Sequence, residues 1–533
     1  MSEVFLSADL LDNLMIEELL RPVLETGIGF TNCEEEIRAR NVNIQLLSEN
    51  PSLQSICRTL CLKYADLEQI TRLNSPDTKQ IFSVLPLLDE LYRAMENFSK
   101  IVSEASALSS NANLSQLQNE FNAIRQNEFQ PDFLEKWKNM LSGLQDIHSL
   151  TYRFVFNDDL EITRYCLLTV EDQAYTKRGL LSKIDPHQKH DMNFLARNMD
   201  AYKNQYFAHE SYAMTPGAAA PSTGALRQAS SLFEKEVRDN RLANIQTVLM
   251  TTIPTLYSRQ DQELWNAVRS LGTRILRKLE SAYRSIHFWL RALELMEKIR
   301  QLDLPLAYPH ILPASDHACH ITGAYHPAVA MHLERPSEII CNDISFDDKQ
   351  QFLLITGANG GGKTTYLRTV GVQQLFFQLG LPLPAKDAQI SPVDSIVCAF
   401  SLKEDTHLSS GKLGQELIVI QQAIQSISGR ALVLFNEPIT GTSVGECCLI
   451  SREILAIMTL LEIRGIWVTH LYSLLDDVSD INDMLQGNPI GYLHLDDQFH
   501  VKPGRGENLS HARAVFEKEV LGFSQAEAQA LDT

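Results

Sequence analysis

Two polar stretches of this 533-residue chain each follow a hydrophobic run, and both contain side chains that could act on a phosphate group. The first, GANGGGKT at 357–364, fits the pattern GxxxxGK[ST] and lies between the apolar run QFLLIT and a helical pattern. The second, NEPITGTS at 436–443, follows the apolar run ALVLF. Both patterns place polar residues at the end of a predicted strand, where open α/β sheets bind ligands.

The first stretch has the composition of a loop that binds phosphate through its backbone. Glycine lets backbone N–H groups approach phosphate oxygens closely, and the start of the following helix adds a partial positive charge. We expect Lys363 to bind the β- and γ-phosphates of ATP and the Thr364 hydroxyl to bind Mg²⁺. The predicted ATP-binding residues are Gly357, Ala358, Asn359, Gly360, Gly361, Gly362, Lys363, Thr364 and Thr365.

The second stretch begins with Asn436, where nucleotide hydrolases usually have Asp. We predict that Glu437 is catalytic, because a carboxylate at this position accepts a hydrogen bond from the water that attacks the γ-phosphate. We expect Asn436 to be a metal ligand, directly or through water, that holds Mg²⁺ weakly because its amide lacks charge. A nucleotide-binding scaffold without hydrolysis is the alternative that Asn436 leaves open.

Two further segments have the order expected of an ABC-type ATPase. LSSGKLGQE at 408–416 is similar to the signature segment of those proteins. That resemblance implies that Ser410 and Gly411 contact the γ-phosphate bound by a second subunit. GIWVTH at 465–470 is a predicted strand ending at His470, which we predict to sense the γ-phosphate, the alternative being a structural histidine at a strand end.

The sequence before residue 313 predicts helices. Long amphipathic patterns dominate it and β-branched runs are few, so we expect an all-α core and lever region over 1–312. The clearest helix is 269–300, which has an apolar stripe on one face. The opposite face has a basic line that is either solvated or a surface that contacts DNA. This line comprises Arg277, Arg284, Arg291 and Lys298.

After residue 313 the pattern changes to short apolar runs that alternate with helical patterns, which is typical of an α/β structure. The predicted fold is therefore multidomain, with an all-α region at 1–312 and an α/β P-loop (ABC-type) ATPase domain at 313–533. Small, uncharged residues at 213–226 predict a flexible loop within the helical region.

Composition limits the partners of the chain. Its 47 basic and 66 acidic residues give a net charge of −19, so any contact with DNA must be local. Nine scattered cysteines without a CxxC pair indicate reduced thiols rather than disulfides. The N-terminus lacks the basic residues of a signal peptide, and no apolar run reaches about 18 residues. These features predict a cytoplasmic protein with no membrane contact.

The motifs together resemble the MutS family of DNA mismatch repair ATPases. TGANGGGKTTYLRTVG at 356–371 is similar to that family's TGPNMGGKSTYLRQ, and NEPITGTS to its DEIGRGTS. Weaker similarity extends to segments 324–329, 383–394 and 499–515. The family's aromatic residue near the adenine is replaced by Ile339, and GKLGQEL replaces its Ser-Thr-rich signature. Because the chain starts almost at the helical core, we expect no mismatch-reading domain.

The resemblance implies a homodimer with two composite ATP sites, a C-terminal dimerisation segment, and helical arms that open or close around a partner. The leading hypothesis is an ATP-dependent DNA clamp that acts in repair or recombination on mismatched, branched or otherwise structured DNA. The alternatives are a P-loop switch for a protein or ribonucleoprotein partner and a weakly hydrolysing nucleotide-binding scaffold.

Overall fold

A computed structural model gives the arrangement of the chain. The structure describes residues 4–7, 9–72, 78–129, 149–156, 162–171, 261–347, 350–357, 360–400, 411–461, 463–484, 489–496 and 498–506. The loop predicted at 213–226, Ala358, Asn359, Ser410 and the segment after residue 506 lie outside these residues.

Contacts divide the chain into two compact units. One comprises Met1–Cys57, Asn111–Leu114 and Ala282–Thr533, and the other comprises Arg58–Ser110 and Ser115–Ser281. The first unit joins the start of the chain to its C-terminal half, so the grouping does not follow a single division at residue 312.

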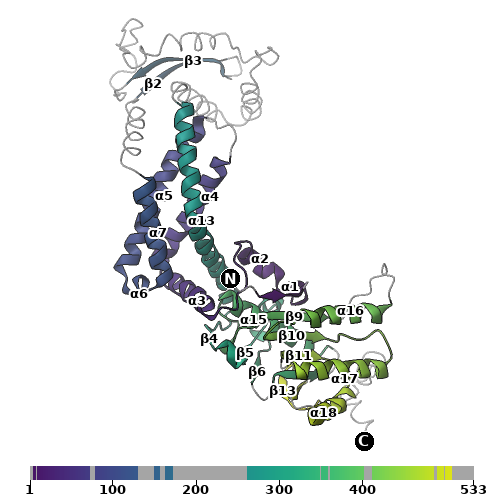
Figure 1. The fold of residues 1–533 in the computed structure, drawn as a ribbon. Coiled ribbons are helices and arrows are strands. Elements are labelled where there is room, and N and C mark those ends of the chain that lie inside the picture. Colours follow the sequence, from purple (N-terminus) through teal and green to yellow (C-terminus); the bar gives the residue numbers. More distant parts are fainter. Residues whose placement is uncertain are drawn as a thin grey trace. The chain divides into compact units, whose positions relative to one another are not determined.

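The described residues of the unit formed by 58–110 and 115–281 are mostly helical, as the amphipathic patterns predict. Figure 1 shows α5 and α7 side by side, and Phe98 of α5 meets Phe121 of α7 edge to face at 5.0 Å between ring centroids. Leu271 and Ile275 of α13 are buried in the apolar stripe predicted for that helix. The helices in this part of the chain are α4 (Pro51–Thr71), α5 (Thr78–Glu104), α6 (Ser106–Ser109), α7 (Ala112–Glu128) and α13 (Asp261–Arg300).

Strands within 1–312 correct the prediction that this region is all-α. β2 and β3 form an antiparallel pair, and β1 joins a sheet of the other unit. The sequences SLTYRFVF and ITRYCLLTVE of β2 and β3 are rich in the β-branched and aromatic residues that favour strands. β1 is only two residues long and exists because it pairs with a strand far along the chain. The strands within this range are β1 (Phe5–Leu6), β2 (Ser149–Phe156), β3 (Ile162–Glu171) and the two-residue β4 (His310–Ile311).

The other unit is a mixed helical and α/β structure built on a seven-stranded sheet, which agrees with the α/β prediction for the second half of the chain. The strand order is β1-β9-β10-β11-β7-β12-β13, and every pair is parallel except β12 with β13. The strands are β7 (Phe352–Thr356), β9 (Ser395–Phe400), β10 (Ala431–Asn436), β11 (Arg464–Val468), β12 (Ile490–Leu495) and β13 (Val501–Pro503).

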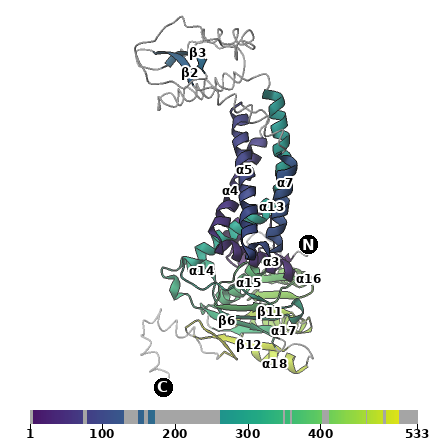
Figure 2. The same cartoon turned by 90° about the vertical axis from the view of Figure 1, so that its left-hand side faces the viewer.

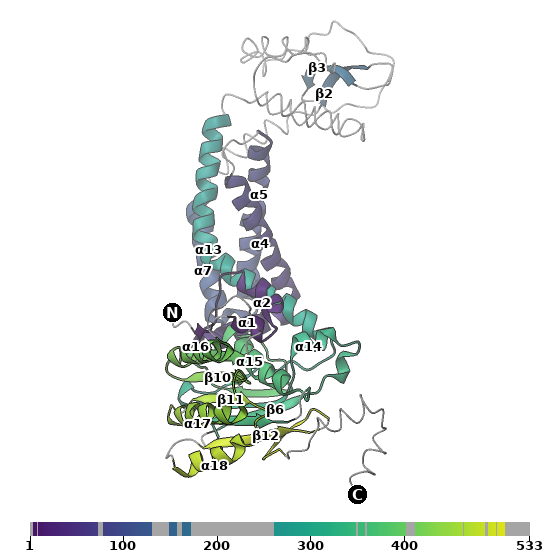
Figure 3. The same ribbon diagram turned by 90° about the vertical axis from the view of Figure 1, so that its right-hand side faces the viewer.

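Helices cover both faces of this sheet. Buried residues of α16, α17 and α18 share one core with Val433 and Phe435 of β10. Because side chains alternate along a strand, Leu434 lies on the opposite face, where it packs closely against Gly371 of α15. Figures 2 and 3 show α15 on one side of the sheet and α17 and α18 on the other. The helices are α15 (Lys363–Leu379), α16 (Lys412–Gln425), α17 (Val444–Leu460) and α18 (Leu474–Met484).

A second sheet of four strands packs beside α15, in the order β4-β8-β5-β6. α15 is buried almost all round, and the amides of Gln373, Gln374 and Gln378 donate to backbone carbonyls of the surrounding chain. The strands are β4 (His310–Ile311), β5 (Cys319–Ala324), β6 (Asn342–Phe346) and β8 (Asp387–Ile390). The remaining helices are α1 (Leu10–Asn13), α2 (Glu17–Leu24), α3 (Glu34–Glu49), α14 (Pro327–His332) and the 3-10 turns Ala314–Asp316 and Pro336–Glu338.

None of the helices formed by the described residues combines the length and the apolar character needed to cross a membrane.

Candidate functional site

The order of the central strands brings the two polar stretches together. β10, β11 and β7 are parallel neighbours, so their carboxyl ends meet at one edge of the sheet. Gly357 follows β7, Asn436 ends β10, and His470 lies just beyond β11. The edge is the location at which an open α/β sheet binds its ligands.

The loop after β7 has the geometry that its glycines predict. Gly357, Gly360 and Gly362 have φ angles of 154°, 77° and 85°, which side-chain-bearing residues rarely adopt. The loop leads into α15, whose first residue is Lys363. The backbone N–H groups at this helix start have no partners within the helix and are suited to bind an anion.

The side chain of Lys363 is fixed against the start of this loop. It is only 5% exposed, and its Nζ donates to the carbonyl oxygen of Gly357 at 2.7 Å. Burial lowers the pKa of the Lys363 ammonium, and the negative charge of Glu437 opposes that shift. A buried cation beside the N–H groups of a helix start is suited to bind an anion with several negative charges.

Asn436 contacts the first turn of α15 directly. The Thr364 hydroxyl donates to Asn436 Oδ1 at 3.0 Å, so the two oxygens predicted to serve Mg²⁺ are adjacent. Hydroxyl and amide oxygens are suitable ligands for Mg²⁺, but neither carries charge, so most of the attraction would come from the nucleotide phosphates. Among the described residues no group of three His, Cys, Asp or Glu side chains could hold a metal ion.

Glu437 adopts a strained backbone conformation. Its φ is 46°, in the left-handed region, where a non-glycine residue costs on the order of 1–3 kcal/mol. Its N–H donates to the carbonyl oxygen of Val468 at 2.9 Å, which holds this turn against β11. Its Oε2 lies 3.3 Å from Nδ1 of His470, and both side chains are partly exposed, by 28% and 45%. Glu437, the predicted catalytic carboxylate, and His470, the predicted sensor of the γ-phosphate, are therefore in contact.

The predicted signature segment is only partly described. Gly411 is exposed and precedes the first residue of α16, while Ser410 lies outside the described residues. A contact of these residues with a second chain stays a prediction, as do the roles assigned to the other site residues.

Phe499 belongs to this edge of the sheet, although the sequence did not single it out. It lies in the turn between β12 and β13, and a Cβ atom added to Gly362 would be 3.2 Å from its ring. Asn342 of β6 fixes the turn, because its amide donates to the carbonyl oxygen of Phe499 at 3.1 Å and accepts from the N–H of Val501 at 2.7 Å. The only sequence signal was the segment FHVKPG, whose position depends on the pairing of β12 with β7.

Comparison with known proteins finds a similarity over part of the chain. Residues 353–488 match the family model described as MutS domain V. This range contains β7 except its first residue, Phe352, and all of α15, Gly411, the end of β10 and His470. This part of the chain is similar to the MutS family. The glycine loop, Asn436, Glu437 and His470 all lie inside the matched range, and Phe499 lies outside it.

Three relatives show the extent of the similarity. The chain is 28% identical over 197 residues to the DNA mismatch repair protein MutS of Brevibacillus brevis and 28% identical over 202 residues to that of Syntrophomonas wolfei. It is 31% identical over 142 residues to the DNA mismatch repair protein MSH2 of Saccharomyces cerevisiae. The matches cover 34%, 37% and 26% of this chain but only 22%, 23% and 14% of the relatives, in the same order. Activities of the whole relatives therefore do not transfer to this chain directly.

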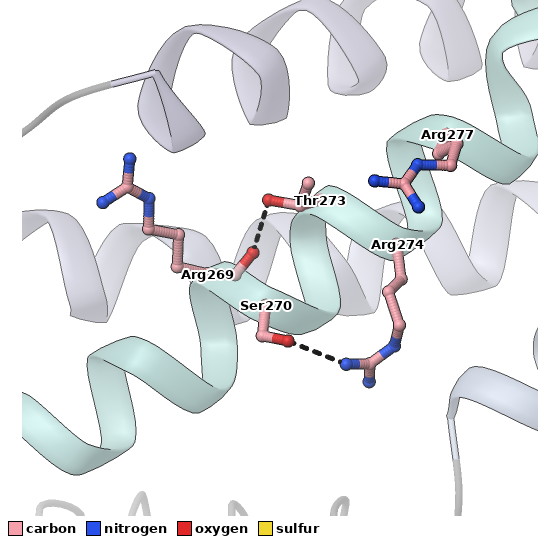
Figure 4. A pocket seen from close by; sticks show the side chains of 5 residues that line it. All are labelled: Arg269, Ser270, Thr273, Arg274 and Arg277. Atoms are coloured by element: carbon pink, nitrogen blue, oxygen red, sulfur yellow. Dashed lines mark hydrogen bonds between the residues drawn. The ribbon is translucent and has the colours of Figure 1, made fainter.

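A separate basic depression lies on α13. It has a volume of about 350 Å³ and is lined by Arg269, Ser270, Thr273, Arg274 and Arg277 (Figure 4). Arg274 is paired with Glu128 of α7 at 3.0 Å and also donates to Ser270, whereas no ion pair of Arg269 or Arg277 is formed within the described part of the chain. Of the predicted basic line, only Arg277 lines this depression. Arg291 is paired with Glu294 on its own helix, as expected of a solvated face.

Proposed function

We propose that this chain is an ATP-dependent DNA-binding protein of the MutS family, which uses slow ATP hydrolysis to switch between conformations. The observation that carries the proposal is the pair of contacts Thr364–Asn436 and Glu437–His470 at the mouth of a glycine loop. These contacts support the proposal because one joins the two predicted metal ligands and the other joins the two predicted catalytic residues.

In the proposed mechanism, the glycine loop and Lys363 bind the phosphates, and Mg²⁺, when bound, would offset the negative charge of the phosphates. Thr364 and Asn436 would hold that ion through their oxygens. Glu437 accepts a hydrogen bond from the attacking water and orients it. His470, which contacts Glu437, responds to the presence of the γ-phosphate. Binding energy available in only one nucleotide state then shifts the population of conformations.

We propose a homodimer in which Gly411 of each chain completes the site of the other, and DNA as the partner. The basic depression on α13 supports a local phosphate contact on a molecule whose net charge is −19. The same charge favours the second candidate, a MutS-like ATPase switch acting on a protein or ribonucleoprotein. A preference for mismatched or branched DNA applies to the first candidate only.

The catalytic part of the proposal is tested with Glu437→Gln. We expect ATP binding to be retained and turnover to be lost, because the substitution removes the carboxylate but leaves the glycine loop intact. Glu453→Gln, at an exposed position of α17, is the matched control and should leave both quantities unchanged. Turnover at the wild-type rate in Glu437→Gln would show that another group activates the water.

The DNA part is tested by measuring affinity for a branched duplex against salt concentration. Arg277→Ser should lower the slope of log affinity against log salt by about 0.9 if Arg277 neutralises one phosphate. Arg335→Ser removes the same charge from an exposed position near the second sheet and serves as the control. An unchanged slope in Arg277→Ser would remove the depression from the DNA contact, and salt-independent binding of the wild type would favour the protein partner.

A further inference from the structure

A buried carboxylate joins α16 to the loop that follows Glu437. Glu416 lies in the second turn of α16 and is only 1% exposed. Its Oε2 accepts hydrogen bonds from the N–H groups of Thr440 and Gly441, at 3.0 and 2.9 Å. Its Oε1 accepts from the Thr440 hydroxyl at 2.7 Å. None of the described residues forms an ion pair with Glu416, so its charge is satisfied by loop donors alone.

The loop approaches the helix too closely for a side chain to intervene. A Cβ atom added to Gly441 would be 2.6 Å from the backbone nitrogen of Leu413 and 2.9 Å from Glu416 Oε2. The loop is also fixed at its far end, where Ser443 caps α17 by accepting from the N–H of Glu446. The segment between Glu437 and α17 is therefore held from one side by α16 and from the other by its own helix.

The position of Glu416 connects two predicted parts of the site. Five residues before it, α16 is preceded by Gly411, which is predicted to contact the γ-phosphate bound by a second chain. Three residues after Glu437, the loop reaches Thr440. Glu437 itself has a strained φ of 46°, and such a conformation persists only where the surrounding contacts determine it. On the side of β11, the conformation of Glu437 is held by the hydrogen bond from its N–H to the carbonyl oxygen of Val468. On the side of the loop, it is held by the hydrogen bonds between the loop and Glu416.

We propose that Glu416 is a positioning residue that fixes the orientation of Glu437 for hydrolysis by tying its loop to α16. A carboxylate suits this role because it accepts all three hydrogen bonds without donating any. A glutamine in its place removes the negative charge, and when its oxygen accepts from the two N–H groups its NH₂ group faces the Thr440 hydroxyl, which must then accept instead of donate. If a partner chain at Gly411 displaced α16, the hydrogen bonds of Glu416 would then transmit that movement to the loop and to Glu437. This inference rests on the proposed ATPase function.

The test compares Glu416→Gln and Thr440→Val with the wild type and with the control Glu453→Gln. Thr440→Val removes the hydroxyl donor but keeps both backbone bonds, and it is the milder variant if Glu416→Gln folds poorly. We expect kcat to fall roughly 10- to 100-fold in Glu416→Gln, because small misplacement of a catalytic group has effects of this size, while KM and the affinity for ATP change little. Thr440→Val should lower kcat less.

A double-mutant comparison distinguishes positioning from a general loss of stability. Thr440→Val should lower kcat in the wild type but have less effect in the Glu416→Gln background, because the charged acceptor of the hydroxyl is already lost. Fully additive effects, or a wild-type kcat in folded Glu416→Gln, would overturn the inference. If Glu437→Gln abolishes turnover and Glu416→Gln does not, only the positioning role fails. If the wild-type chain shows no turnover at all, both proposals fail.

Discussion

Replacing Asn436 with aspartate would measure how the altered strand end affects the metal. The Thr364 hydroxyl already donates to Asn436 Oδ1 at 3.0 Å, and a carboxylate oxygen accepts the same bond. Aspartate and asparagine have nearly the same shape, so packing at the end of β10 should not change. The substitution therefore adds one negative charge at a fixed position beside the predicted ion.

The size of the effect follows from the exposure of the site. Asn436 is half-buried, so the appropriate dielectric is closer to that of water than to that of a protein interior. Two unit charges about 4 Å apart interact by roughly 1 kcal/mol in water, and a divalent ion doubles this to about 2 kcal/mol. The hydration that the new carboxylate loses when it contacts the ion offsets part of the gain. We expect a net fall of roughly tenfold in the Mg²⁺ concentration that gives half-maximal rate, equivalent to about 1.4 kcal/mol.

The assay is a titration of ATPase rate against Mg²⁺ at saturating ATP for the wild type and Asn436→Asp. Gln421→Glu adds the same charge at an exposed position of α16 and should leave the Mg²⁺ requirement unchanged. A lower maximal rate in Asn436→Asp would remain consistent with the reasoning, because the added charge lies next to Glu437. Equal Mg²⁺ requirements in all three proteins would place residue 436 outside the metal's surroundings and refute it.

Three other predictions concern the dimer, the nucleotide base and acid stability. Mixing inactive Lys363→Ala and Gly411→Asp chains should restore part of the ATPase activity, and no recovery in confirmed heterodimers would argue against shared sites. Phe499→Ala should weaken ATP binding roughly tenfold if its ring stacks on the base, with kcat unchanged at saturation, whereas unchanged affinity would place the base elsewhere. Burial raises the pKa of Asp394, but hydrogen bonds from Arg430 outweigh this and leave the pKa below its usual value. Its contribution to stability is therefore present above the unfolded pKa of about 3.9 and is lost as the pH falls through the folded value, so urea unfolding of Asp394→Asn should depend less on pH in acid.

The local motifs could be predicted because their signals lie within a few residues of one another. β7 was predicted from QFLLIT and runs from Phe352 to Thr356, and β10 coincides with ALVLF plus Asn436. The predicted helix 269–300 is confirmed as part of α13. The helix begins eight residues earlier than predicted, at Asp261, and ends at Arg300. In each case a buried strand or an amphipathic helix imposes its own period on the sequence.

The features that the sequence did not predict depend on contacts between distant segments. β1 has two residues and no period of its own, and it forms because Phe5 and Leu6 pair with Ser395 and Ile396. The contact of Phe499 with the glycine loop requires β12 to pair with β7 first. The residues around Glu416 form an ordinary helical pattern. Its hydrogen bonds to the loop after Glu437 form only when that loop folds against α16. Motif spacing contains no information about such contacts.

Asn436 in place of the usual Asp could affect the site through its geometry or through its charge. The geometry of the site is present: the Thr364 bond to residue 436, the strained Glu437 and its contact with His470 form together at one edge of the sheet. Only the negative charge at residue 436 is missing. A loss confined to charge would weaken the attraction for a cation and would leave Glu437, the carboxylate proposed to orient the attacking water, in place. The site is therefore more consistent with the proposed slow, Mg²⁺-demanding ATPase than with an inert scaffold, because a scaffold would not require the strained conformation of Glu437.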